Sequence, residues 1–328
     1  VRYTLRRWEE FHGDLPLERI ARWHINEFDE ALKQLPAATG KHRNLTFRQS
    51  AAQAKHDGTA PISVKTRETM LLHLKSLTAF ALDKLGVIST DPFVGYTTDK
   101  PKQKASAAKK KSVKPYTPAQ VRQILDHAKT FDRATIDYWL PLLAAYTGAR
   151  MEELAQLNVD DVSLIGNHWC IRITDLDDDQ KVKNLHSVRT VPVPPVVMRE
   201  GFLDFADSRR QAGAKLLFQE FYKANGQKAV LQDVKPNERG RFSDNYGTRF
   251  RRKVREPLGL TSEGMQFHSL RHSWTDAARR AKIDPEIRRM IAGRLEDADP
   301  TEAKYGGDDL LAEKLEALNA IAPYIASP

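Results

Sequence analysis

The stretch PTEAKYGG, from Pro300 to Gly307, places a tyrosine in a short polar helix that is expected to end at a glycine pair. No large apolar residue nearby would cover the ring of Tyr305, so the pattern predicts an exposed phenol. A phenol hydroxyl has a pKa of about 10 and is a poor nucleophile unless its developing charge is stabilised. Exposed tyrosines are common, so Tyr305 becomes a catalytic candidate only if cationic groups accompany it.

A first cationic candidate stands in YTGARMEELAQL. Thr147 and Gly148 predict a turn, and Arg150 is expected in the first turn of the helix that follows. Free backbone N–H groups and the positive end of the helix dipole favour an anion at such a position, and a guanidinium strengthens it. The alternative is a surface arginine paired with Glu153, three residues further on.

The stretch FHSLRHSW repeats this arrangement. His268 and Arg271 are three residues apart, so both are expected on one face near the start of a helix. His268 and His272 also have the i, i+4 spacing of a zinc pair. However, no glutamate follows the first histidine, and Arg271 between them would repel a cation. We therefore predict no metal here and expect His272 to pack inward beside Trp274.

Two further candidates lie in expected loops. Lys183 is near the tip of DLDDDQKVKNLHSVRT, a polar loop between two predicted strands, where a lysine is free to act as a proton donor. The aspartates of this loop would suit magnesium, but acids at a hairpin tip are usually only solvated. Gly293 is expected to end a helix that Asp284 and Pro285 begin, which leaves Arg294 in an exposed turn.

These residue types together suit phosphoryl transfer that needs no metal. Attack on a phosphodiester adds negative charge to its non-bridging oxygens, and the forked donors of arginine match those oxygens. Removing one such donor costs about 2.7–4 kcal/mol in comparable sites. The leaving 5′-oxygen needs a proton, which Lys183 could supply. The sequence thus predicts neither a cofactor nor a metal site.

Composition sets the wider frame for this chemistry. The 328 residues allow two domains, each with its own core, and no apolar run approaches the ~20 residues that span a membrane. The net charge of +9 and the pI near 9.4 favour a polyanionic partner such as nucleic acid. Cys170 is the only cysteine, which excludes an intrachain disulfide and predicts a cytoplasmic protein, associated with the nucleoid if the partner is DNA.

A lysine-rich segment divides the chain. Residues 101–115, PKQKASAAKKKSVKP, hold six lysines and no acid, so we predict an extended linker at 99–115. If the polyanionic partner is a nucleic acid, Lys109, Lys110 and Lys111 are expected along its phosphates. The linker separates a domain at 1–98 from a domain at 116–328.

The first domain is predicted to be helical. In HINEFDEALKQL, one helical stripe contains four apolar residues, Ile25, Phe28, Leu32 and Leu35. The later stretch SVKTRETMLLHLKSLTAFALDKLG predicts a longer helix that ends near Gly86, with Leu71, Leu74, Leu77 and Ala81 facing inward. In its first turn, Lys65 and Arg67 could contact phosphates, and the alternative for both is an ordinary solvated charge.

The second domain is predicted to be mainly α with a small antiparallel β-sheet. Thr117, Pro118 and Gln120 form a capping box that begins a run of helices to Leu157. Three strands follow, DVSLIG, HWCIRIT and SVRTVPV, and helices return from about Ser243. Within YGTRFRRKVRE, from Tyr246 to Glu256, Arg249, Arg251 and Arg252 are expected to contact the DNA backbone. The alternative is an ordinary basic surface.

The chain resembles the tyrosine recombinases of the phage-integrase type. Four motifs carry the resemblance in the family's order: TGARMEEL, VKNLHSVRTVP, FHSLRHSW and KYGG. They cover 116–328, and the helical segment 1–100 resembles, less strongly, the family's core-binding domain. The implied fold is a two-domain DNA clamp of a helical core-binding (SAM-like) domain and an α+β catalytic domain.

The resemblance also implies roles. Arg150 and Arg271 would clamp the scissile phosphate, Lys183 would protonate the leaving oxygen, His268 would assist proton transfer, and Tyr305 would form a 3′-phosphotyrosyl bond. Arg294 departs from the pattern, because the family usually has His or Trp after the glycine. Arginine can still donate hydrogen bonds to a phosphate oxygen.

The implied activity is site-specific DNA recombination for integration or excision of a mobile element. A resolvase, a type IB topoisomerase and a DNA-binding protein with impaired catalysis are the alternatives. The expected partner is double-stranded DNA, with a homotetramer on paired sites and accessory DNA-bending or directionality proteins. In DDLLAEKLEALNAIAPYI, the apolar face of Leu311, Leu315 and Leu318 predicts a helix exchanged between protomers, and the alternative is that it folds back on its own domain.

Overall fold

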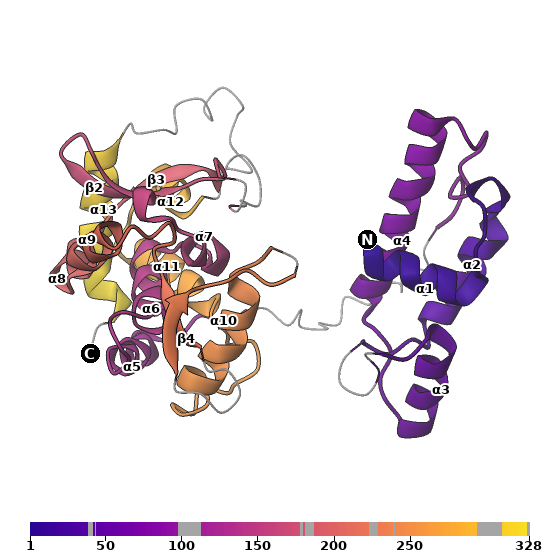
Figure 1. The fold of residues 1–328 in the computed structure, drawn as a ribbon, viewed down its shortest axis with the longest axis horizontal. Helices are drawn as coiled ribbons and strands as arrows, with labels where there is room; N and C mark the ends of the chain where they lie inside the picture. The colour runs from indigo at the N-terminus through magenta and orange to yellow at the C-terminus, as the bar shows by residue number, and fades with distance from the viewer. Residues whose placement is uncertain are drawn as a thin grey trace. The chain divides into compact units, whose positions relative to one another are not determined.

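The computed structural model describes residues 1–38, 42, 44–97, 113–177, 180, 187–222, 229–238, 240–293 and 310–326. The chain forms two compact units, residues 1–107 and 108–328, which are described separately below (Figure 1). Most of the predicted lysine-rich linker, including Lys109, Lys110 and Lys111, lies outside the described residues.

The first unit is helical over its described residues, as predicted. Its elements are α1 (Arg2–His12), η1 (Leu17–Arg19), α2 (Arg22–Leu32), α3 (Phe47–Asp57), α4 (Val64–Phe80) and η3 (Ala81–Leu85). The four apolar residues of the predicted stripe on and after α2 are all fully buried, in a core that also contains Trp8, Phe47 and Leu74. Burial of this stripe is the main force that holds α2 against its neighbours.

Helix α4 carries the first of the predicted DNA-contacting residues. Its N-cap is Ser63, and the π-helical η3 continues it to Gly86, whose positive φ of 62° ends the helix as expected. Lys65 is exposed, but Arg67 is buried and pairs with the buried Asp29 at 3.4 Å. The prediction that Arg67 contacts phosphates is therefore not supported, because the side chain is part of the core of this unit.

The second unit contains the remaining elements. The helical ones are α5 (Pro118–Ala128), α6 (Ile136–Thr147), α7 (Met151–Ala155), η4 (Val159–Asp161), α8 (Pro195–Arg199), α9 (Phe202–Gln211), α10 (Ser243–Phe250), η6 (Arg251–Arg255), α11 (Ser269–Arg280), α12 (Pro285–Ala292) and α13 (Leu311–Ile325). The strands are β1 (Val162–Ile165), β2 (His168–Ile173), β3 (Arg189–Pro192), β4 (Gln219–Tyr222) and β5 (Val230–Asp233).

The three predicted strands form an antiparallel sheet in the order β1-β2-β3, with a turn at Gly166 between the first two. Cys170, in β2, is buried as expected. A second sheet, the hairpin of β4 and β5, was not predicted. The residues of β4, QEFY, do not alternate between polar and apolar side chains, so period 2 predicts no strand there.

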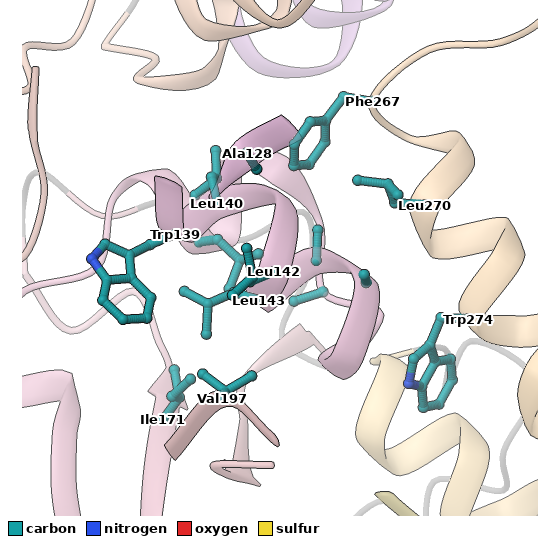
Figure 2. Packing of buried hydrophobic residues seen from close by; sticks show 14 of the residues in the cluster. Ala128, Trp139, Leu140, Leu142, Leu143, Ile171, Val197, Phe267, Leu270 and Trp274 are labelled. Carbon is teal, nitrogen blue, oxygen red and sulfur yellow. The ribbon is translucent and has the colours of Figure 1, made fainter. Parts of the chain in front are cut away.

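Helix α6 forms the centre of the second unit. Leu140, Leu142 and Leu143 on it are almost completely buried, and Figure 2 shows Leu270 and Trp274 of α11 on one side, with Ile171 of β2 and Val197 of α8 below. A helix that is apolar on nearly all sides is stable only when other elements surround it. The C-terminus of α6 and the N-terminus of α11 therefore have fixed places, and both predicted arginine motifs lie at these ends.

Helix α13 packs against its own unit, where it contacts α5, α6, α11, α12 and β3. Its buried face comprises Leu311, Lys314, Ala317, Leu318, Ile321 and Ile325, whereas Leu315 is only half-buried. In this single chain the helix thus occupies the alternative position, folded back on its own domain. Its exchange between protomers stays a prediction.

Candidate active site

The turn between α6 and α7 positions the first arginine. Helix α6 ends at Gly148, whose φ of 66° lies in the left-handed region. A Cβ at this glycine would lie 2.6 Å from the ring of Trp274, so no larger residue fits. The hydroxyl of Thr147 donates to the carbonyl of Leu143 at 2.6 Å and accepts from the N–H of Ala149 at 3.2 Å. The turn is therefore held rigidly against α11.

Arg150 follows this turn as the N-cap of α7 and is only 22% exposed. Its Nη1 donates to Glu153 Oε1 at 2.5 Å and to the hydroxyl of Ser187 at 3.2 Å, and its Nη2 donates to the carbonyl of Gly293 at 3.2 Å. Its backbone N–H donates to Glu153 Oε2 at 2.8 Å. The pair with Glu153 that was the alternative for Arg150 thus exists, although Arg150 is half-buried and not a surface residue; the anion held at the start of α7 is this carboxylate.

Arg150, Arg189 and Arg271, with the carboxylate of Glu153, are called the arginine group below. Glu153 is the negatively charged residue at its centre. Its side chain is 2% exposed and also accepts a hydrogen bond from Arg189 Nη2 at 2.8 Å. Burial alone would raise the pKa of Glu153, but the charges and hydrogen bonds of Arg189 and then Arg150 lower it to about 2. The carboxylate is therefore ionised at neutral pH and fixes both guanidinium groups.

Arg271 reaches the same turn from α11. The residue is 2% exposed, and its Nη1 donates to the carbonyl oxygen of Gly148 at 2.6 Å. The guanidinium of Arg271 therefore contacts the backbone of the turn that carries Arg150, the other predicted clamp arginine. His268 is the N-cap of α11, one turn before Arg271, and its ring centroid lies 5.2 Å from that of His272. Both histidines are half-buried, so the inward packing expected for His272 is incomplete.

The sequence of residues 115–293 matches the phage integrase family. The chain belongs to this family. The match covers more than half of the chain and includes the arginine motifs at 150 and 271. The resemblance to tyrosine recombinases is thereby confirmed. The prediction of a mainly α fold with a small antiparallel β-sheet is confirmed as well, whereas the two-domain DNA clamp stays a prediction.

Solved structures of family members share the fold at low sequence identity. The integrase of the Tn1549 transposon, solved in complex with transposon right-end DNA, is 17% identical, with a TM-score of 0.50 over 93% of this chain and 86% of that chain. The XerH site-specific recombinase, bound to a palindromic difH substrate in a post-cleavage complex, is 15% identical, with a TM-score of 0.53 over 98% of this chain and 77% of that chain. No curated protein matches the sequence.

The remaining predicted catalytic residues of this family member, Lys183, Arg294 and Tyr305, lie outside the described residues. Two described residues near them in the sequence accept hydrogen bonds from Arg150. Ser187, after the Lys183 loop, accepts from Arg150, and so does the carbonyl of Gly293, directly before Arg294. Gly293 ends α12 with a φ of 63°, as its sequence position predicts.

Two described tyrosines in the core of the second unit, Tyr116 and Tyr246, are unsuited to nucleophilic attack. Burial raises the pKa of Tyr116 to about 12 and raises that of Tyr246 well above its usual range. Both rings are almost fully buried. A nucleophile drawn from them would need both exposure and a strong opposing charge.

The predicted DNA-contacting segment forms α10 and η6. Arg251 and Arg252 are exposed, as a phosphate contact requires. The side chain of Arg249 is only 18% exposed and forms ion pairs with Asp137, at 2.8 Å, and with Glu220. The prediction for Arg249 is therefore not supported, because this guanidinium ties α10 to α6 and β4. Arg251 pairs with Glu256 at 3.5 Å on the surface.

Glu152 attaches this segment to the arginine group. Its two carboxylate oxygens accept the backbone N–H groups of Phe242 and Ser243, each at 2.9 Å, at the start of α10. A negative charge at a helix N-terminus is stabilising. The adjacent residues Glu152 and Glu153 thus connect α7 to α10 on one side and to β3 on the other.

No group of three or more His, Cys, Asp or Glu side chains within the described ranges could hold a metal ion. Across those same residues, no helix is long and apolar enough to cross a membrane.

Sequence reasoning missed three members of the site, Glu153, Arg189 and Ser187. From the sequence, Glu153 is only a surface partner of Arg150, and Arg189 is only one residue of a predicted strand. The available signal was an arginine inside SVRTVPV, a strand otherwise rich in valine, since a charge that is covered on both faces of a sheet needs a buried partner.

Proposed function

We propose that this chain is a site-specific DNA recombinase that cuts and rejoins DNA through a covalent tyrosine intermediate, for integration or excision of a mobile element. The observation that supports it most is the meeting of Arg150 and Arg271 at the Gly148–Arg150 turn. Family membership of residues 115–293 supports the same activity.

The charge balance of the group suits a phosphodiester. Among the described residues, Arg150 and Arg189 share the single carboxylate of Glu153, and Arg271 donates to the carbonyl of Gly148. These guanidinium groups lie in a partly buried setting, where charges are screened less than in water. A scissile phosphate that gains negative charge on attack is stabilised there more than in its ground state. Outside this site, the net charge of +9 also favours association of the protein with DNA.

The proposed reaction has two transesterification steps. The hydroxyl of Tyr305 attacks the phosphorus and loses its proton, with His268 assisting this transfer, while the bond to the 5′-oxygen breaks and a proton from Lys183 neutralises the leaving oxygen. The product is a 3′-phosphotyrosyl bond. A 5′-hydroxyl from a second strand then attacks the phosphorus and returns a proton to Lys183, and the tyrosine oxygen leaves and regains its own proton. The number of phosphoester bonds is unchanged, so no nucleotide cofactor is needed.

The related structures indicate the substrate class. The Tn1549 integrase is solved with transposon-end DNA, and XerH with difH after cleavage. We infer that this chain likewise acts on double-stranded DNA as a tetramer on paired sites, together with accessory DNA-bending or directionality proteins. Arg294 would contact the phosphate where relatives use histidine or tryptophan. The exposed Lys65, Arg251 and Arg252 and the linker lysines would contact the backbone.

A suicide substrate tests the proposal. The duplex carries the sequence of the junction that flanks the gene, with a nick that releases a short 5′-hydroxyl fragment on cleavage and so traps the covalent product. We expect a band of protein-linked DNA on a denaturing gel with the natural chain and none with Tyr305→Phe. A duplex that is bound in a mobility-shift assay but never forms this band would contradict catalysis. Relaxation of plasmids that lack the site would instead indicate a topoisomerase.

A further inference from the structure

Arg189 is the first residue of β3, and each of its three guanidinium nitrogens donates a hydrogen bond. Nε donates to the carbonyl of Ile291 at 2.8 Å, Nη1 donates to the carbonyl of Ser187 at 2.7 Å, and Nη2 donates to Glu153 Oε2 at 2.8 Å. The side chain is only 4% exposed. It is therefore too enclosed to contact DNA itself.

Each of these three partners contacts a predicted catalytic residue or lies within a few residues of one in the sequence. Glu153 holds both the side chain and the backbone N–H of Arg150. Ser187 is the first described residue after the loop of Lys183 and also accepts from Arg150. Ile291 belongs to the last turn of α12, shortly before Arg294. One guanidinium thus connects the three chain segments that supply these groups.

Gly293 shows how closely the end of α12 approaches Arg189. A Cβ built on this glycine would lie 2.5 Å from Nη1 and 2.9 Å from Cζ of Arg189. Real Cβ contacts are not this short, and the φ of 63° also disfavours other residues. The position of this turn is therefore fixed by direct contact with the guanidinium.

We propose that Arg189 is a positioning residue for DNA cleavage, which holds Arg150, through Glu153, in a fixed place relative to Ser187 and to the end of α12 at Gly293. This inference rests on the proposed function. A buried ion pair alone is weak evidence for a stabilising role, since apolar residues can often replace it. Three hydrogen bonds that diverge from one planar group to three segments require an arginine, because lysine keeps the charge without this fork.

Arg189→Lys provides the test, with Arg209→Lys as the matched control. Arg209 is a second buried arginine of the same unit that donates to backbone carbonyls of Leu216 and Leu217 and pairs with Asp233, at the base of the β4–β5 hairpin. Both variants lose a fork and keep a charge. They differ in what the lost hydrogen bonds hold: those of Arg189 join the partners of Arg150 and the end of α12, whereas those of Arg209 hold the base of the β4–β5 hairpin.

The measurements are the affinity for the junction duplex and the single-turnover rate of adduct formation on the suicide substrate, at a temperature where circular dichroism shows both variants folded. For Arg189→Lys we expect affinity within about 3-fold of the natural chain and a cleavage rate about 100-fold lower, the effect of a misplacement of about 1 Å. For Arg209→Lys we expect both quantities to stay within about 3-fold.

A second substrate separates positioning from general loss of structure. When sulfur replaces the bridging 5′-oxygen, the leaving thiol has a pKa near 8.5 and departs without a donated proton. If Arg189, through Ser187, supports the proton donation proposed for Lys183, the defect of Arg189→Lys should shrink by at least about 10-fold on this substrate, as should that of Lys183→Ala. A structural defect would be the same on both substrates.

Gly293→Ala disturbs the contact between Gly293 and the Arg189 guanidinium while it leaves Arg189 unchanged. It therefore provides a second test if Arg189→Lys does not fold. We expect it to lower the cleavage rate with affinity retained. Equal losses of affinity and rate in both variants, or a natural cleavage rate in Arg189→Lys, would overturn the inference alone. A natural chain that forms no adduct on a duplex it binds would overturn the proposed function, and the inference with it.

Discussion

At the scale of single residues, the negative charge of Glu153 keeps the guanidinium groups of Arg150 and Arg189 in their positions. Its side chain is 2% exposed, and it contacts Arg150 and Arg189 at once. Removing one partner of a buried ion pair leaves an uncompensated charge and costs about 3–5 kcal/mol. We therefore expect Glu153→Gln to lower the free energy of unfolding at pH 7 by about this amount, measured by urea denaturation.

The same substitution should show a defined pH dependence. The pKa of Glu153 in the folded chain is about 2, below the ordinary value of 4.5. A lowered folded-state pKa contributes stability that is complete above pH 4.5 and is lost as the pH falls towards 2; the full contribution is about 3 kcal/mol. The gap between the natural chain and Glu153→Gln should thus narrow from pH 5 to pH 3. A constant gap would mean that the carboxylate charge is not what stabilises the group.

At the scale of elements, the turn from α6 to α7 is where packing and chemistry meet. Gly148 combines a φ of 66° with a Cβ position 2.6 Å from Trp274, whereas Gly166 has a φ of 56° and nothing within 4 Å. Gly166→Ala should cost only the left-handed strain, about 1–2 kcal/mol. Gly148→Ala should cost about 1–3 kcal/mol more, because the methyl group overpacks the core.

Thermal unfolding of the two glycine variants gives this difference directly. Gly148→Ala should also reduce cleavage, because its methyl group pushes against Trp274, one turn after Arg271, whose guanidinium bonds to the carbonyl of residue 148. Gly166→Ala should cleave normally. Equal losses of stability in both variants would show that Trp274 has room to move aside.

The elements themselves were largely predictable, because their signals are local. The capping box at Thr117, the buried stripe around Phe28 and the turn at Gly166 each depend on residues a few positions apart, and the structure has all three. The predicted extended linker and the predicted catalytic roles stay predictions. The site's chemistry-bearing arginines could be named from motifs, and the structure brings Arg150 and Arg271 together.

What the sequence could not show was which charges are buried. Arg67 and Arg249 look like surface cations in their own helices, but their partners, Asp29 for one and Asp137 with Glu220 for the other, come from distant elements. The links from Arg189 to α7 and α12 are equally distant in sequence. Local periodicity carries no information on such contacts, since it reports only the face of an element.

At the scale of the whole molecule, α13 decides whether the catalytic unit is self-contained or shared. Its buried face of Leu311, Leu318, Ile321 and Ile325 packs in its own unit, and each large side chain of this kind contributes about 1.5–3 kcal/mol by burial. Buried among them, Lys314 donates from Nζ to the carbonyl of Thr190 at 3.5 Å, next to Arg189. Docking of α13 is therefore linked to the strand that organises the arginine group.

If protomers exchange α13, the surface that it covers must accept the same helix from another molecule. A chain that ends at residue 309 should then bind an added peptide of residues 310–326, with a rise in Tm and a gain in adduct formation. The same peptide with Ile321→Asp should bind at least about 10-fold more weakly, because the carboxylate would be buried without a partner. Failure of the natural peptide to bind the folded, truncated chain would mean that α13 docks only within its own protomer, since a surface that rejects the helix from solution offers no site for a neighbour's copy.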